Sequence, residues 1–111
     1  MKSANGDRKF FEIMCLVCTD SNILYWQEKD MFIPSIMEEK VIRSHICHDN
    51  ILINIDHISE ITMPLIKEYR VCHNHDATTR KCKTFTIRLV NGQLYVLPFF
   101  EYEKFKNYIL K

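Results

Sequence analysis

The stretch Phe85-Thr-Ile-Arg-Leu-Val-Asn-Gly-Gln-Leu-Tyr-Val-Leu97 indicates the fold class of this chain. In its first half, apolar residues alternate with Thr86 and Arg88, which is the period of a strand with one buried face. A second apolar run, residues 94–97, follows the pair Asn91-Gly92. Asn-Gly favours the positive φ values that a type I′ turn needs at both central positions. The stretch therefore predicts an antiparallel hairpin.

The apolar period changes after Pro98. Tyr102, Phe105, Tyr108 and Ile109 follow one another at spacings of three, three and one, so that they share one side of a helix. Residues 100–110 are therefore predicted to form a short amphipathic helix that closes one end of the sheet.

The rest of the chain is also predicted to be rich in strands. Apolar and β-branched runs predict strands at residues 10–18, 23–27, 41–47 and 51–55. Residues 31–37, interrupted by Pro34, are interpreted as an edge strand or a helical turn, and the polar residues 67–83 as a long loop. The predicted class is α+β, mainly antiparallel β with about seven short strands and one C-terminal amphipathic helix.

Length and composition indicate a single folded domain. The 111 residues suit one domain, predicted at residues 10–111, preceded by a polar and flexible arm at residues 1–9. The hydrophobic fraction of 47% is ordinary for a globular protein. Without a membrane-spanning run or the apolar core of a signal peptide, the chain is expected in the cytoplasm, with its five cysteines reduced.

Catalytic patterns are missing from the sequence. The only glycines, Gly6 and Gly92, cannot make a phosphate-binding loop. The adjacent pairs Cys47-His48 and Cys72-His73 would point to opposite faces of a strand. We therefore expect a non-catalytic protein that uses no cofactor.

Two groups of cysteine and histidine residues bear on metal binding. Cys15 and Cys18 have the spacing of a zinc knuckle, but residues three apart on a strand face opposite sides, which favours two buried thiols. Cys72, His75 and Cys82 lie in the predicted loop, where ligands can converge, so a zinc-stabilised interaction domain is one alternative. Their spacing fits no common zinc template, and scattered polar loop residues are the simpler interpretation.

Basic residues gather in and after the predicted loop. These are Lys67, Arg70, Arg80, Lys81, Lys83 and Arg88. They could form one cationic face for phosphate groups. An ordinary solvated surface is an equal alternative, because the net charge of the whole chain is only +1.

The segment Cys47-His-Asp-Asn-Ile-Leu-Ile-Asn-Ile-Asp-His-Ile-Ser-Glu-Ile61 resembles the LytTR family of bacterial DNA-binding domains. That family has a His, a small polar stretch, an apolar strand ending in Asn, and two Ile-like positions at the spacing of Ile58 and Ile61. The strand, turn, strand and helix predicted after residue 84 are also similar to the family. The resemblance covers roughly the second half of the chain. It implies a mostly β fold that inserts loops into the DNA major groove, generally within response regulators.

The chain departs from the LytTR pattern at several positions. Asp49 would repel phosphate, Pro98-Phe99-Phe100 stands where the family often carries Arg, and residues 67–83 form an insertion. A second resemblance, in the order of elements alone, is to the pleckstrin-homology superfold. That resemblance implies a module that binds proteins, peptides or lipid headgroups.

The leading prediction is a LytTR-like module that binds duplex DNA and regulates transcription. The resemblance gives His48 and Asn50 as candidate contacts, and the basic segments add Arg80, Lys81 and Arg88. A pleckstrin-homology-like module that binds a protein, a peptide or a lipid is the alternative.

Overall fold

The computed structural model describes residues 9–19, 22–27 and 32–110. In chain order the elements are β1 (Phe10–Leu16), β2 (Cys18–Thr19), β3 (Ile23–Tyr25), β4 (Ile36–Met37), α2 (Glu39–His45), β5 (His48–Asn54), η1 (Ile55–His57), β6 (Ile58–Ile61), β7 (Leu65–His73), β8 (Asp76–Leu89), β9 (Leu94–Pro98), η2 (Phe99–Glu101) and α3 (Tyr102–Ile109). The predicted α+β class is confirmed, with mainly antiparallel strands and a C-terminal helix. None of the described helices is both long and apolar enough to cross a membrane.

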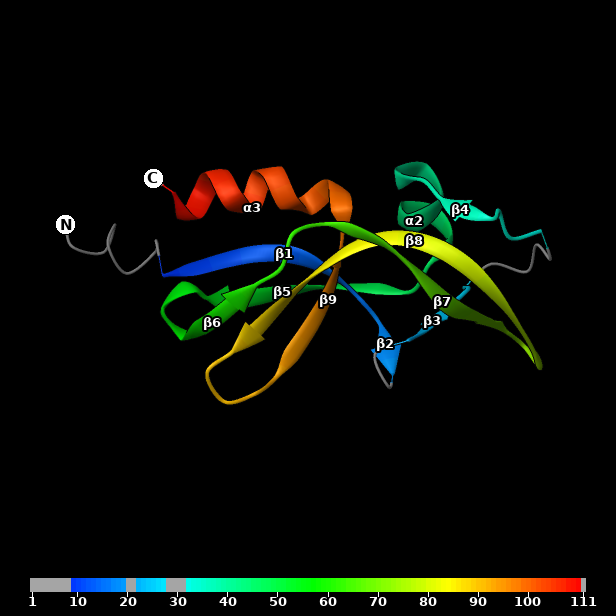
Figure 1. The fold of residues 1–111 in the computed structure, drawn as a ribbon, viewed down its shortest axis with the longest axis horizontal. Helices are drawn as coiled ribbons and strands as arrows, with labels where there is room; N and C mark the ends of the chain where they lie inside the picture. Colours follow the sequence, from blue (N-terminus) through cyan, green and yellow to red (C-terminus); the bar gives the residue numbers. More distant parts are fainter. Residues whose placement is uncertain (1–8, 20–21, 28–31, 111) are drawn as a thin grey trace.

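Strand β8 is the central strand of the larger sheet (Figure 1). Its residue Thr84 has Leu65 of β7 on one side and Pro98 of β9 on the other. Strand β6 pairs with the end of β8, on the same edge as β7. The short β4 pairs in parallel with β8 at Lys81. Strands β3 and β2 extend the sheet beyond β7. The 14 residues of β8 therefore hold together segments from both halves of the chain.

A second sheet consists of β1 and β5, paired antiparallel from Phe10↔Asn54 to Leu16↔His48. Helix α3 lies along β1 at one end of the molecule, and α2 lies with β4 at the other (Figure 1). The carboxylate of Glu101, only 6% exposed, accepts the main-chain N–H of Met14 at 3.0 Å. This bond fastens the segment before α3 to β1.

The apolar interior divides into two cores. The α2-side core consists of Leu16, Leu24, Trp26, Ile33, Met37, Ile42, Ile46, Tyr69, Val71, Cys82 and Val96. The α3-side core consists of Ile13, Ile53, Phe85, Ile87, Leu97 and Phe105. Strands β1, β8 and β9 each contribute to both cores, so these three strands connect the two ends of the molecule.

Two predicted segments have a different structure. Residues 67–83 are not a loop, because they form most of the β7–β8 hairpin. The alternation of buried Tyr69, Val71 and His73 with polar residues is a strand pattern. The many charged residues of this segment obscure the alternation in the sequence, although charged residues are expected on an exposed sheet face.

The predicted strand at residues 41–47 is a helix over most of its length, α2. Ile42 and Ile46, four residues apart, are both fully buried, which is the spacing of one helix face. Glu39 and Arg43, also four apart, form an ion pair at 2.8 Å on the exposed side. Only seven residues are helical, so the period is too short to distinguish from alternation in the sequence.

The turn between β8 and β9 is not type I′. Among the described residues only Gly92, at φ 91°, and Asn74, at φ 56°, have positive φ, so Asn91 does not. The Gly92 N–H donates to Leu89 and the Leu89 N–H to Gln93, a three-residue turn in which glycine takes the left-handed position.

The predicted arm falls mostly on residues outside the described ranges. Of residues 1–9, only Lys9 is described, and its carbonyl accepts the N–H of Ile55 at 2.6 Å. Lys9 is therefore tied to the end of β5 and does not belong to a free arm.

We expect Phe105→Ala to lower the free energy of unfolding by about 3–5 kcal/mol, because the fully buried ring fills the α3-side core. Urea denaturation monitored by circular dichroism measures the change. Leu110→Ala, at a side chain 72% exposed, is the control and should change stability by less than about 0.5 kcal/mol. Equal effects of the two substitutions would contradict the placement of α3.

Candidate nucleic-acid interface

The β7–β8 hairpin has one buried and one exposed face. Cross-strand partners point to the same side of a sheet, and Tyr69 and Val71 point inward. The intervening residues therefore point outward, from β7 and from their partners on β8. We call this outward surface the hairpin face, and it comprises Ile66, Glu68, Arg70, Cys72, Ala77, Thr79, Lys81 and Lys83.

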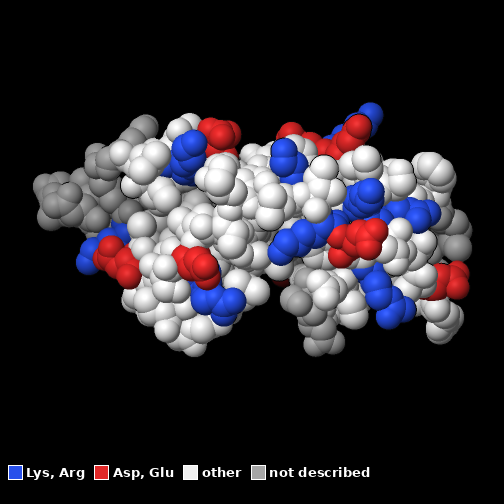
Figure 2. Space-filling view, viewed as in Figure 1, with Lys and Arg blue, Asp and Glu red and all other residues white. Residues whose placement is uncertain are grey.

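The hairpin face is positively charged. It carries three cations and one carboxylate, and Glu68 lies directly opposite Lys81. Lys81 and Lys83 are two residues apart on one strand, which separates their Cα atoms by about 7 Å. Figure 2 shows Lys and Arg side chains around a carboxylate over the β7–β8 end of the molecule. Because the whole chain has a net charge of only +1, this face concentrates positive charge locally.

The tip of the hairpin presents polar groups to solvent. Asn74, with φ of 56°, and His75 make the two-residue turn between β7 and β8, and both are exposed. Behind the tip, His73 is only 6% exposed, and its Nδ1 atom has no hydrogen-bond partner among the described residues. The exposed Asn74 and His75 therefore offer an amide and an imidazole that can bind groups outside the protein.

The three basic residues predicted as contacts are not gathered together. Lys81 lies on the hairpin face, whereas Arg80 points to the other side and donates from Nε to the Ile33 carbonyl at 2.9 Å. Arg88 lies seven residues beyond Lys81, about 24 Å along β8, and pairs with Glu60 at 3.5 Å. Of the predicted basic contacts, only Lys81 belongs to the hairpin face.

The two predicted contacts from the LytTR resemblance lie on β5, in the other sheet. The Nδ1 of His48 is 2.8 Å from the Ile46 carbonyl, so this half-buried ring is partly engaged by the protein. Asn50 is exposed and pairs with Met14. These residues belong to the β1–β5 sheet, whereas the hairpin face belongs to the larger sheet.

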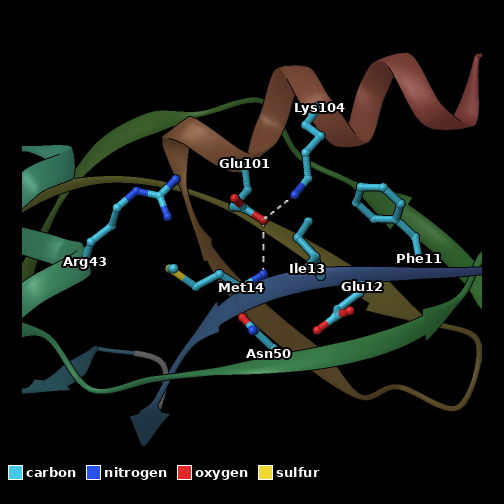
Figure 3. A pocket seen from close by; sticks show the side chains of 8 residues that line it. All are labelled: Phe11, Glu12, Ile13, Met14, Arg43, Asn50, Glu101 and Lys104. Carbon is cyan, nitrogen blue, oxygen red and sulfur yellow. Dashed lines mark hydrogen bonds and ion pairs between the residues drawn. The ribbon is translucent and has the colours of Figure 1, made fainter.

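Asn50 lines an open pocket of about 510 Å³ between α2, α3 and β1 (Figure 3). Arg43 and Lys104 reach into it from opposite sides, and Glu101 lies between them. Each of these charges already has a partner. Arg43 pairs with Glu39, and Lys104 approaches the Glu101 carboxylate at 3.9 Å. The Arg43–Glu39 pair lies within α2, and the Lys104–Glu101 pair lies within the helical segment of η2 and α3. Glu101 also joins that segment to β1 by accepting the Met14 N–H.

The three candidate zinc ligands do not converge. Cys72 lies opposite Ala77, five residues before Cys82 on β8, which puts the two thiols about 17 Å apart along the strand and on opposite faces. Within residues 9–19, 22–27 and 32–110, no three His, Cys, Asp or Glu side chains are grouped to hold a metal ion.

Two cysteines are buried core residues. Burial raises the pKa of the Cys82 thiol to about 12. It also raises the pKa of Cys15 to about 11, against the opposing effect of the hydrogen bond to the Val96 carbonyl. Cys18, its partner in the knuckle spacing, is only half-buried, so the prediction of two buried thiols holds for Cys15 alone.

The hairpin also contains residues that are not among the predicted contacts. On the hairpin face, Arg70 and Lys83 belong only to the wider basic set, and at the tip Asn74 is not a predicted contact. The alternation from Tyr69 to His73 would have placed Arg70 outward, had the segment been interpreted as a strand.

Comparisons with known proteins give no relative: no family model, no curated protein and no solved structure matches the chain. The class of this protein comes from its structure alone, which is an α+β domain with a basic hairpin.

We expect the thiols of Cys15 and Cys82 to resist Ellman's reagent in the folded protein at pH 8, because the reactive thiolate is suppressed by burial. At most three of the five cysteines should react before unfolding, and all five in guanidinium chloride. Circular dichroism under the same conditions is the control for an intact fold. Rapid reaction of all five thiols in a folded sample would contradict the burial of these two.

Proposed function

We propose that this protein binds duplex DNA through the β7–β8 hairpin. The observation that carries the proposal is the hairpin face, where Arg70, Lys81 and Lys83 point to the same side. Cations arranged in this way displace the counterions of the phosphate backbone, which supplies most of the sequence-independent affinity for DNA. The LytTR resemblance independently suggests the same kind of partner.

The shape of the hairpin suits the DNA major groove. That groove is about 12 Å wide and accepts a two-stranded β-ribbon. With the cations on the phosphates, the exposed Asn74 and His75 at the tip can approach the edges of the bases. Asparagine side chains can bind adenine through two hydrogen bonds. In this proposal, Arg70, Lys81 and Lys83 position the hairpin, and the tip contributes specificity.

The residues His48 and Asn50 remain a separate expectation from the resemblance. They lie on β5 and can contact DNA only through a second surface. Replacing Asn50 should leave binding unchanged if the hairpin is the sole interface, and should weaken it if β5 is a second one.

We expect the double substitution Lys81→Gln, Lys83→Gln to weaken binding to mixed-sequence duplex DNA. The slope of log K against log salt should decrease in magnitude by about 2, because each lost phosphate contact removes about 0.9 from it. Fluorescence anisotropy with a labelled duplex, measured between 50 and 200 mM NaCl, gives both slopes.

The matched control is Lys9→Gln, Lys106→Gln, which removes the same charge at the α3 end of the molecule. Lys9 pairs with Asp56, and Lys106 stacks over Tyr102, so neither belongs to the hairpin face. An equal loss in the control would show an effect of net charge alone. If the unmodified protein does not bind duplex DNA at 50 mM NaCl, the proposal is wrong.

A second candidate function is binding to an anionic lipid surface, which belongs to the pleckstrin-homology-like alternative. The observation that favours it is the exposure of Ile36 and Ile66, at 52% and 58%, among the cations of the hairpin face. Apolar side chains within a basic patch suit a negatively charged membrane surface. Co-sedimentation with phosphatidylserine vesicles, in the absence of DNA binding, would favour this function.

A further inference from the structure

The inner face of the β7–β8 hairpin, opposite the hairpin face, becomes polar towards the tip. On β7, Val71 and His73 face inward and are buried. Their partners on β8 are Thr78 and Asp76, and cross-strand partners lie on the same side of a sheet. Arg80, two residues beyond Thr78, faces the same way. The α2-side core therefore gives way, at this end of the hairpin, to side chains that carry charge or form hydrogen bonds.

A pocket of about 210 Å³ opens on this polar part of the inner face. It is smaller than the pockets of about 300–1,000 Å³ that bind drug-sized ligands. At about 30 Å³ per molecule of liquid water, it has room for roughly seven waters, or for a ligand with about that number of non-hydrogen atoms. Two lining side chains are apolar and four can form hydrogen bonds. The lining residues are Ile33, Val71, His73, Asp76, Thr78 and Arg80.

The imidazole of His73 is the first feature of this pocket that indicates a ligand. His73 is more than nine-tenths buried, and its Nδ1 atom has no hydrogen-bond partner among the described residues. Buried polar groups in folded proteins nearly always form a hydrogen bond, because leaving one unpaired lowers stability. The ring lines the pocket, so a molecule bound there can supply the partner that the protein does not.

The guanidinium of Arg80 is the second such feature. Its Nε donates to the Ile33 carbonyl and its Nη1 to the Thr79 carbonyl, both at 2.9 Å. These two bonds fix the plane of the group, and Nη2 has no partner within the described part of the chain. None of the ion pairs between described residues includes Arg80. A guanidinium held in this way binds a carboxylate with little loss of side-chain freedom.

Asp76 adds a negative charge to the same pocket. It lies four residues before Arg80 on β8, with the half-buried Thr78 between them. Their Cα atoms are about 13 Å apart along the strand, yet both side chains line the pocket without forming an ion pair with each other. A simple anion would be attracted by Arg80 and repelled by Asp76. A molecule that carries both charges finds an opposite charge for each.

We propose that this pocket binds a small amino acid in its zwitterionic form. The carboxylate of the ligand accepts hydrogen bonds from Nη2 of Arg80, and its ammonium group donates to Asp76. The Nδ1 atom of His73 and the Thr78 hydroxyl form further hydrogen bonds with these polar groups. The apolar lining residues contact the short hydrocarbon part of the ligand.

This pocket is separate from the surface of the proposed function. Arg70, Lys81 and Lys83 point to the opposite side of the hairpin, and none of them lines the pocket. Amino-acid binding therefore does not rest on the proposed DNA binding.

Titration of the nitrogen-15-labelled full chain with L-alanine, followed by NMR, tests the proposal. The amide signals of Val71, Thr78 and Arg80 should shift, with a dissociation constant of about 0.1–10 mM, since a ligand of so few atoms binds weakly. Propionate lacks the ammonium group of alanine, and ethylamine lacks its carboxylate. Each should bind at least about tenfold more weakly than alanine, because one charged hydrogen bond is lost.

The variant Asp76→Asn tests the charge arrangement and should fold, because Asp76 is exposed. It should weaken alanine binding about tenfold and leave propionate binding unchanged or stronger, since propionate has no ammonium group to lose a partner. Asp49→Asn is the matched control. It removes the same charge at an exposed residue of β5, in the other sheet, and should leave both affinities unchanged.

Three results overturn the proposal. They are the absence of any shift at these amides with alanine up to about 50 mM, propionate binding as tightly as alanine, and equal effects of Asp76→Asn and Asp49→Asn on alanine binding. No sample contains DNA, so these results decide the pocket alone. Failure of the unmodified protein to bind duplex DNA rejects only the proposed function.

Discussion

The structure depends on the main-chain pairing of β8 along both of its edges. A strand that pairs on both sides satisfies its N–H and C=O groups within the sheet, and so it can pass through the interior without burying unpaired polar groups. Its side chains supply Cys82 to the α2-side core and Phe85 and Ile87 to the α3-side core. The buried Thr84, between them, shares a hydrogen bond with the Tyr69 hydroxyl. One strand thereby connects two apolar clusters that would otherwise be separate.

This arrangement leaves one face of the sheet exposed towards the hairpin tip. Towards the α3 end, β8 is covered by apolar residues of β1, β9 and α3. Towards the hairpin tip, no described element covers the outward face, which carries the exposed residues Arg70, Lys81 and Lys83. Residues on that face can be replaced without opening either core, so the proposed DNA binding and the stability of the fold can be measured separately.

Elements whose apolar residues repeat with a clear period could be predicted from the sequence. The prediction was wrong where charged residues hid that period. Residues 85–97 and the closing helix were predicted because their apolar residues repeat at two and at three to four positions. The β7–β8 hairpin was interpreted as a loop, since the exposed face fills every second position with polar residues. Arg80 and Lys81 were grouped as contacts, although adjacent residues of a strand point to opposite sides. The assignment of this segment as a strand is enough to place Arg80 and Lys81 on opposite faces of the hairpin.

The hydrogen bond from Met14 to Glu101 joins residues 87 positions apart in the chain. The α3-side core likewise combines Ile13 of β1 with Phe105 of α3. During synthesis, β1 is made long before the residues of η2 and α3 that it contacts. Its apolar side chains stay exposed until those residues are synthesised. Contacts of such long range also slow folding, because loop closure precedes the gain from packing. The nascent chain is therefore expected to acquire its native tertiary structure only after residue 105 has left the ribosome.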